Sequence, residues 1–191
     1  ELPEVGVVTA SGGNHGAALA YVAGRLGVPA EVFVPSTSPA LKQENIARFG
    51  AAVTVVQGYY DDAWAVAQRR VAQTGALFVP AFDHPDTVAG QGTMARELEQ
   101  QLRETGGGLD TMLVAAGGGG VLGGQAAWPQ ERGKGVAVGP MSTSCVHAAR
   151  AAGAPVDVPV GGLAADSLGS KRVGEAPWAV LRDHLDEAVL V

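Results

Sequence analysis

Two glycine-rich segments hold the residues best suited to chemistry. The first, residues 9–16, reads Thr-Ala-Ser-Gly-Gly-Asn-His-Gly and follows a short apolar run. Glycines after a strand let the backbone turn tightly, and the helix that follows offers unpaired N–H groups to an anion. The side chains of Ser11, Asn14 and His15 add hydrogen-bonding groups at the same turn. A plain strand-to-helix turn capped by Asn14 explains the same residues, so the local pattern leaves both interpretations open.

The second segment, residues 115–124, contains four successive glycines after the apolar run Thr111–Ala115. Such a run can turn several backbone N–H groups into one concavity, which suits a phosphate. The segment is not a P-loop because no Gly-Lys-Ser/Thr follows, and it does not match a spaced dinucleotide fingerprint. A flexible loop or a close packing of helices is the structural alternative. The four glycines are Gly117, Gly118, Gly119 and Gly120.

Short β-branched runs alternate with longer amphipathic segments along the whole chain. This alternation predicts strands at residues 5–10, 30–35, 53–56, 76–80, 111–115, 136–139 and 188–191. It predicts helices at residues 15–26, 39–49, 60–74, 88–104, 121–127, 145–152 and 175–185. Gly27, Gly50 and Gly75 each follow an expected helix, as left-handed caps do.

Strand-helix alternation with short connections predicts right-handed crossovers and mostly parallel sheets, so the fold class is α/β. A turn-rich seam, Asp-His-Pro-Asp at residues 83–86, divides the pattern. We expect a smaller αβ lobe at residues 1–86 and part of a larger αβ lobe at residues 87–191. Both glycine-rich segments follow strand carboxyl ends, where open α/β sheets bind ligands, and we expect them to face one cleft.

Composition excludes several classes of partner. Acidic residues outnumber basic ones by 19 to 13, and no Lys/Arg stripe appears, which argues against nucleic acid. The single Cys145 cannot form an internal disulfide, and this favours a reducing cytoplasm. No apolar run approaches the roughly 18 residues that a membrane span needs, and no signal peptide is visible. Because the chain begins at Glu1 without a Met and Val-Gly-Val-Val at 5–8 already indicates a buried strand, we expect a piece of a longer protein.

Taken together, these motifs resemble those of fold-type II pyridoxal-phosphate enzymes. Residues 11–15, Ser-Gly-Gly-Asn-His, are similar to the Ser-x-Gly-Asn-His loop of that group, and residues 117–120 look like its tetraglycine phosphate loop. Val-Ala-Gly-Gln-Gly-Thr at 88–93 and Ala-Ala-Asp-Ser-Leu-Gly at 164–169 lie in the expected order. The resemblance covers essentially the whole chain and is closest to the serine/threonine dehydratases. It implies two αβ lobes of the tryptophan synthase β type.

The resemblance also implies a role for each matching residue. Asn14 would hydrogen-bond the phenolic oxygen of pyridoxal 5'-phosphate, and the four glycines would hold its phosphate through backbone N–H groups. The carboxylate of an amino-acid substrate would be bound by residues 11–15, namely Ser11, Gly12, Gly13, Asn14 and His15. Racemases of the group have a serine where this chain has Gly12, so the resemblance favours a dehydratase over a racemase.

The implied reaction converts serine- or threonine-type hydroxy amino acids to 2-oxo acids and ammonia, with the cofactor as electron sink. The family's Schiff-base lysine precedes the Asn-His motif by some tens of residues, whereas Lys42, Lys134 and Lys171 all follow it. We therefore expect the catalytic lysine outside this chain and the chain alone to be inactive. The alternatives are another β-elimination or β-replacement in the same family, or an inactive ligand-binding fragment or paralogue. A homodimer is implied because dimers are common among relatives.

Several residues depart from the family pattern or have plainer explanations. The stretch Val-Gly-Pro-Met at 138–141 lacks the Glu that is a metal ligand in some members, so we expect no metal site. Ser167 stands where many relatives have Gly, at a position that the resemblance places close to the cofactor ring. His84, between Asp83 and Asp86, indicates a turn rather than a metal cluster. Cys145 is expected to be an inert buried thiol. Core or interface anchors are expected at Trp64, Trp128 and Trp178.

Overall fold

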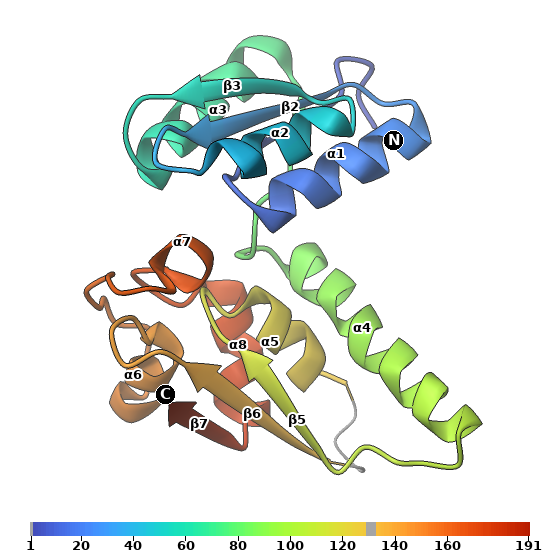
Figure 1. Cartoon of the computed structure of the whole chain (residues 1–191), viewed down its shortest axis with the longest axis vertical. Coiled ribbons are helices and arrows are strands. Elements are labelled where there is room, and N and C mark those ends of the chain that lie inside the picture. Colours follow the sequence, from blue (N-terminus) through green and yellow to red (C-terminus); the bar gives the residue numbers. More distant parts are fainter. Residues whose placement is uncertain (1, 129–132) are drawn as a thin grey trace. The chain divides into compact units, whose positions relative to one another are not determined.

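The computed structural model describes residues 2–128 and 133–191. The chain divides into two compact units, an N-terminal unit, Glu1–Ala81, and a C-terminal unit, Phe82–Val191 (Figure 1). The division falls slightly before the seam expected near residue 86. The reason is that helix α4 (Pro85–Glu104) belongs to the C-terminal unit and starts immediately after His84, whose ring nitrogen accepts from the backbone N–H of Asp86 at 3.2 Å.

The N-terminal unit is built on a four-stranded parallel sheet in the order β3-β2-β1-β4. Val7 of the central strand β1 pairs with Ala30 on one side and Leu77 on the other. The strands are β1 (Val7–Ala10), β2 (Ala30–Pro35), β3 (Ala52–Val56) and β4 (Leu77–Phe78). The helices are α1 (Asn14–Leu26), α2 (Ala40–Arg48) and α3 (Tyr60–Thr74).

Helices cover both faces of this sheet, as apolar parallel strands require (Figure 1). Successive strand residues point to opposite faces, so Val32 and Val34 pack with Ile46 beneath α1 and α2. Phe33 lies on the other face with Ala63 and Ala67 of α3. Small helical residues at these contacts let the helices approach the sheet closely.

Helix ends in this unit follow the expected glycine signals. Gly27 and Gly75 are left-handed C-caps with φ of +68° and +74°, a backbone region that favours glycine. At the end of α2 the cap is Phe49, and Gly50, with φ of +90°, follows it. These glycines end each helix where the chain turns back toward the sheet.

The C-terminal unit has a three-stranded parallel sheet in the order β5-β6-β7. Helix α5 packs against both α4 and α8, while α6 lies against β6 and β7 (Figure 1). Helix α7 was not predicted, because a single turn is too short to show helical periodicity. The strands are β5 (Thr111–Ala115), β6 (Lys134–Gly139) and β7 (Glu187–Leu190). The remaining helices are α5 (Gly120–Ala126), α6 (Cys145–Ala152), α7 (Ala165–Leu168) and α8 (Glu175–His184).

The three tryptophans have different environments. Trp64 is 45% exposed, so it is not a core residue of its unit; Ala63 and Ala67 form the buried face of α3 instead. Trp178 is partly buried against the core of the C-terminal unit. The indole nitrogen of Trp128 donates to the carboxylate of Glu99 at 3.0 Å.

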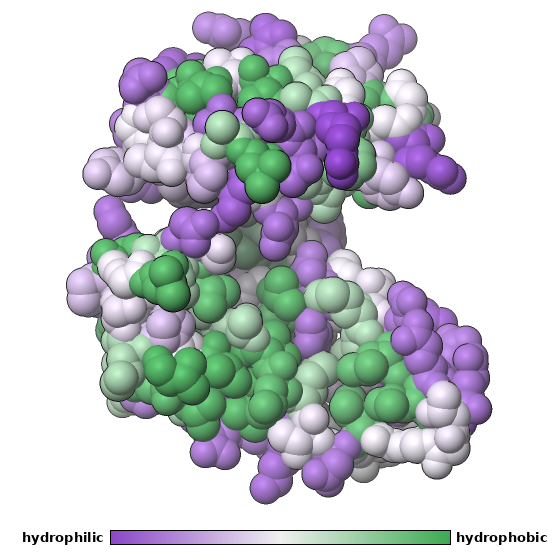
Figure 2. Space-filling view, in the orientation of Figure 1, coloured by the Kyte–Doolittle hydropathy of each residue, from purple (hydrophilic) through white to green (hydrophobic). Residues whose placement is uncertain are grey.

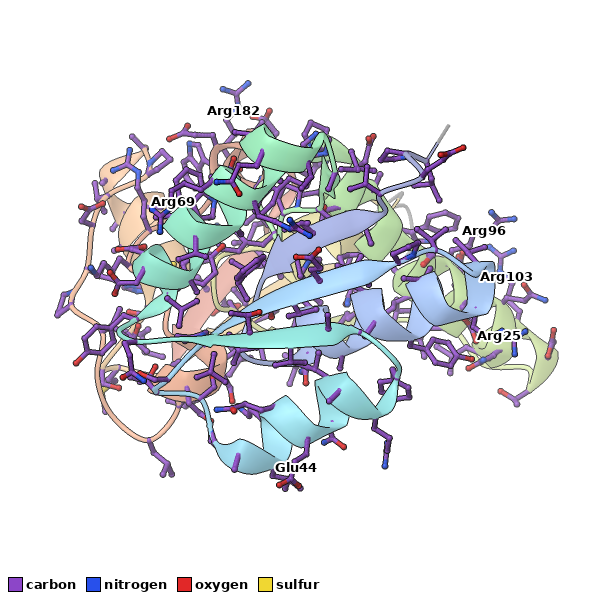
Figure 3. The ribbon with its side chains drawn as sticks, turned by 90° about the horizontal axis from the view of Figure 1, so that it is seen from above. Arg25, Glu44, Arg69, Arg96, Arg103 and Arg182 are labelled. Carbon is purple, nitrogen blue, oxygen red and sulfur yellow. The ribbon has the colours of Figure 1, made fainter. Side chains whose placement is uncertain are left out.

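Polar and apolar side chains share the surface. Figure 2 shows apolar surface on the C-terminal unit, where the large exposed apolar residues include Leu113 of β5, 69% exposed. Figure 3 labels arginines that point outward from four different helices, among them Arg25, Arg69 and Arg182. Within the described residues, no helix is both long and apolar enough to cross a membrane.

Candidate cofactor and substrate site

The tetraglycine loop (residues 117–120) connects the carboxyl end of β5 to the start of α5. The ladder between β5 and β6 closes where the N–H of Ala116 donates to the carbonyl of Val138 at 2.9 Å. The chain then turns, and Gly119 caps α5 with φ of +93°, a conformation that L side chains rarely adopt. The loop therefore lies at the strand end where parallel sheets present ligand-binding groups.

Neighbouring residues leave no room for side chains at Gly118, Gly119 and Gly120. A Cβ on Gly118 would come within 2.6 Å of the Phe82 ring, and one on Gly120 within 2.7 Å of the Phe82 Cβ. A Cβ on Gly119 would lie 2.9 Å from Val173. Close packing, the structural alternative drawn from the sequence, thus applies to this loop, and it fixes the path of the backbone.

The carbonyl groups and the N–H groups of the tetraglycine loop differ in their hydrogen bonding. The carbonyls of three glycines accept from protein groups: Gly117 from the Cys145 thiol at 3.3 Å, Gly118 from the Gly174 N–H at 3.0 Å and Gly119 from the Gly123 N–H at 2.7 Å. Among the residues that the structure describes, none accepts from the N–H groups of the four glycines. A rigid turn with satisfied acceptors and open donors fits an anion such as a phosphate ester.

Cys145 supports this loop from α6. Its side chain is buried, at 2% exposure, as expected from the sequence. Burial raises the pKa of the thiol, and a smaller opposing effect comes from a hydrogen bond with the Ser170 side chain. The thiol is therefore neutral near pH 7, and it donates to Gly117 rather than acting as a nucleophile.

The Asn-His loop (residues 11–15) connects β1 to α1. The hydroxyl of Ser11 accepts from the backbone N–H of Gly16 at 3.1 Å and, more weakly, from that of Gly13 at 3.3 Å. The N-cap position is Gly13, and Asn14 is the first helical residue, with an exposed side chain. The alternative in which Asn14 is the N-cap is therefore wrong, because Gly13 holds that position and the Ser11 hydroxyl accepts from the Gly16 N–H of the first turn.

The first turn of α1 keeps other donors available. No described residue accepts from the backbone N–H groups of Asn14 or His15, which lie where an α-helix has no internal acceptors. These N–H groups and the exposed Asn14 amide lie at the carboxyl end of β1. The loop can therefore hold a carboxylate through backbone donors.

The imidazole of His15 turns back toward the sheet. Its Nε2 lies 3.1 Å from the Thr9 hydroxyl oxygen and 3.1 Å from the Val79 carbonyl. Because Thr9 donates its own proton to Val79 at 2.7 Å, Nε2 must carry a proton and donate to both. Burial lowers the pKa of His15, and the hydrogen bond to Val79 raises it by a smaller amount, so the ring is neutral near pH 7. The contact with Val79 was not predicted from the sequence, since Val79 lies 64 residues from His15. Thr9 lies in the quoted segment, but no role was predicted for it.

Gly12 faces the turn that follows β2. A Cβ on Gly12 would overlap the Ser38 hydroxyl and lie 2.9 Å from the Ser38 Cβ. The backbone of Gly12 is not in the left-handed region, so packing rather than conformation requires glycine here. A hydroxyl is thus present beside position 12 even though residue 12 has no side chain.

The seam residues Asp83, His84 and Asp86 act as turn and cap residues, as the sequence indicated. Asp83 accepts from the backbone N–H of Ala176 at the start of α8, at 2.8 Å. His84 caps α4. Across residues 2–128 and 133–191, no three His, Cys, Asp or Glu side chains are grouped so that they could hold a metal ion.

The three lysines lie on separate elements. Lys42 is in α2, Lys134 begins β6 and Lys171 lies between α7 and α8. Ser167, the departure from the family pattern, is in α7, where its hydroxyl donates to Asp166 at 3.0 Å. The cleft expected between the Asn-His loop and the tetraglycine loop stays a prediction.

The chain is similar over nearly its whole length to known dehydratases and to a racemase. The chain is 38% identical over 191 residues to the biosynthetic L-threonine dehydratase of Escherichia coli, covering 97% of this chain and 36% of that protein. The structure of processed threonine deaminase isoform 2 from Solanum lycopersicum matches 98% of this chain with a TM-score of 0.89 and 28% identity. Maize serine racemase matches 98% with a TM-score of 0.88 and 32% identity; the chain covers 55% and 56% of these two structures.

The family comparison covers the chain from end to end. Residues 1–191 match the family described as pyridoxal-phosphate dependent enzyme. Within this range, both glycine-rich loops follow the carboxyl end of a parallel strand. The chain belongs to the pyridoxal-phosphate dependent enzyme family.

Proposed function

We propose that this chain is part of a dehydratase, or ammonia-lyase, that converts serine- or threonine-type amino acids to 2-oxo acids and ammonia. The chain spans about a third of the length of the curated threonine dehydratases that it matches, so the activity is proposed for the complete protein. The observation that carries the proposal is the set of open N–H donors on the tetraglycine loop, together with 38% identity to a threonine dehydratase.

The tetraglycine loop would hold the cofactor's phosphate. Backbone N–H groups of residues 117–120 would donate to the phosphate oxygens, while Phe82 and Val173 leave no room for side chains at residues 118–120. The exposed amide of Asn14 would donate to the phenolic oxygen. Bound pyridoxal 5'-phosphate supplies an electron sink that makes the α-proton of an amino acid acidic.

The Asn-His loop would hold the substrate carboxylate. The backbone N–H groups of Asn14 and His15 donate to it, and the positive end of the α1 dipole favours the negative charge. Ser11 orients these donors through its bonds to Gly13 and Gly16. His15 contributes only its backbone, because its ring donates to Thr9 and Val79.

The base that removes the α-proton is a residue of the complete protein and not one of Lys42, Lys134 or Lys171. The α-proton and the β-hydroxyl leave as water, and the resulting enamine takes up one water to give a 2-oxo acid and ammonia. The proposal includes an amino-acid substrate, a homodimer and a cytoplasmic location.

The test is an assay of the complete reading frame with L-threonine and L-serine, with 2-oxo acid and D-amino acid measured together. We expect 2-oxo acid to form much faster than D-serine. Gly118→Ala should lose cofactor and activity because its Cβ meets Phe82, whereas the control Gly90→Ala, with nothing within 4 Å of the new Cβ, should keep both. Racemisation as fast as elimination would overturn the proposal and favour a racemase.

A further inference from the structure

Ser38 occupies the space that a side chain at position 12 would need. A Cβ on Gly12 would overlap the Ser38 hydroxyl, lie 2.9 Å from the Ser38 Cβ and lie 3.4 Å from the Pro35 ring. A Cβ on the next residue, Gly13, would meet nothing within 4 Å. Ser38 therefore covers the Asn-His loop at Gly12 and leaves it open at Gly13.

The turn after β2 holds Ser38 in this place. Its N–H donates to the Pro35 carbonyl at 3.0 Å, and its carbonyl accepts from the Gln43 side chain at 2.9 Å. Both backbone groups are thus fixed, and Pro39, which follows, restricts Ser38 to an extended conformation. In the described parts of the chain, no partner binds the Ser38 hydroxyl, and the residue is half-buried.

We propose that Ser38 is a specificity-determining residue of the Asn-His loop. Its hydroxyl takes the place of a side chain at position 12 and donates a hydrogen bond to the carboxylate of the amino acid held there. This inference rests on the proposed function for its ligand, but the location of the hydroxyl does not depend on it.

The Ser38 hydroxyl differs from the other hydrogen-bond donors of the Asn-His loop. The other donors of the loop are backbone N–H groups, whose positions are fixed by α1, and a hydroxyl adds a donor that can rotate toward a carboxylate oxygen. A hydrogen bond to a charged group is stronger than one between neutral groups. A side chain at position 12 and a side chain at position 38 would overlap. The loop can therefore have a side chain at one of these two positions but not at both.

The steric part is tested by thermal unfolding of the 191-residue chain in a double-mutant cycle. Gly12→Ala should lower Tm by about 2–8 °C, from the usual cost of overpacking. In a Ser38→Gly background the same change should shift Tm much less, because both the hydroxyl and the Cβ are gone. An equal shift in the two backgrounds would overturn the placement of Ser38.

The functional part is tested in the complete enzyme. Ser38→Ala keeps the Cβ and should raise KM for L-threonine about tenfold while changing kcat less, as loss of a hydrogen bond to a charged group predicts. Ser38→Thr retains a hydroxyl and should have the KM of the parent enzyme. Thr37 is an exposed neighbour in the same turn, and Thr37→Ala should leave KM unchanged. An unchanged KM in Ser38→Ala would sink the role of the hydroxyl. An inactive parent enzyme would instead refute the proposed function, while the Tm cycle still judges the location of Ser38.

Discussion

The carboxylate of Asp83 accepts a hydrogen bond from the backbone N–H of Ala176 at 2.8 Å. This bond fixes the first turn of α8 to the segment that precedes α4. Gly174, just ahead of that turn, donates to the carbonyl of Gly118 at 3.0 Å. A Cβ on Gly174 would lie 2.7 Å from the Asp83 carboxyl carbon, so the contact is close. Asp83 therefore supports the tetraglycine loop through residues 174–176, which bond to both.

Replacement of Asp83 should weaken both the fold and the phosphate site. Asp83→Ala removes a cap and should cost about 1 kcal/mol of unfolding free energy. Because Gly174 holds the Gly118 carbonyl, we also expect weaker binding of pyridoxal 5'-phosphate, measured by absorbance titration, and little change for pyridoxal, which has no phosphate. Asp83→Asn retains an acceptor, so its stability and its affinity for pyridoxal 5'-phosphate should be close to those of the parent.

The control for this series is Asp183→Ala, which removes an exposed carboxylate near the other end of the same helix. It should leave the affinity for pyridoxal 5'-phosphate unchanged. Equal losses for pyridoxal and its phosphate in Asp83→Ala would mean that Asp83 acts on the fold in general and not on the loop.

Cys145 should react slowly with thiol reagents while the chain is folded. The thiol is 2% exposed and its pKa is raised by burial, so little thiolate is present at pH 8. Ellman's reagent should label it rapidly only after unfolding in guanidinium. Since the folded pKa lies above the ordinary value of 9.0, stability should fall as pH rises past 9, where the unfolded thiol ionises first. Immediate labelling of the folded chain would contradict this account.

The elements with strong local signals could be predicted from the sequence. Strand β2 and helix α3 have the predicted bounds, because β-branched runs, helical periodicity and a following glycine are all local. Strand β4 is only two residues long, against the five expected, since its pairing with β1 depends on register rather than on local residues. Helix α4 starts three residues earlier than predicted, because Pro85 occupies its first position.

The glycine-rich loops could be found from the sequence, but their supports could not. The donors of residues 11–15 and 117–120 follow from glycine runs at strand ends. The contacts that fix them join residues far apart in the chain, such as Thr9 with Val79 and Asp83 with Ala176. Ser38 belongs to no sequence motif, and its proposed role follows only from its position beside Gly12 in the structure.

His15 should make stability depend on pH below about 6.5. Its pKa is lowered in the folded state from an ordinary value of 6.5, so the unfolded chain takes up the proton first. The stability that His15 contributes is therefore complete above that value and is lost as pH falls toward the folded pKa. Urea unfolding between pH 5 and 8 should show this decline. His15→Gln keeps a donor for Val79 and should flatten it, whereas His147→Gln, at an exposed site, should not.

Reduction of the 191-residue chain with borohydride in the presence of pyridoxal 5'-phosphate should trap no lysine at a unique site. The family resemblance places the Schiff-base lysine ahead of the Asn-His loop, and every lysine here follows it. Lys134 pairs with Thr111 at the amino end of β5, whereas the tetraglycine loop follows Ala115, about 13 Å along the strand at 3.3 Å per residue.

Lys171 is the most demanding case for this prediction, because it lies three residues before Gly174, which bonds to Gly118. Peptide mapping by mass spectrometry should find only scattered, substoichiometric labels on the three lysines. Lys171→Ala should bind pyridoxal 5'-phosphate as the parent chain does, because the proposed phosphate donors are backbone N–H groups of residues 117–120. One stoichiometric adduct at Lys171, abolished by that substitution, would show that the residue roles carried over from the family are wrong for this chain.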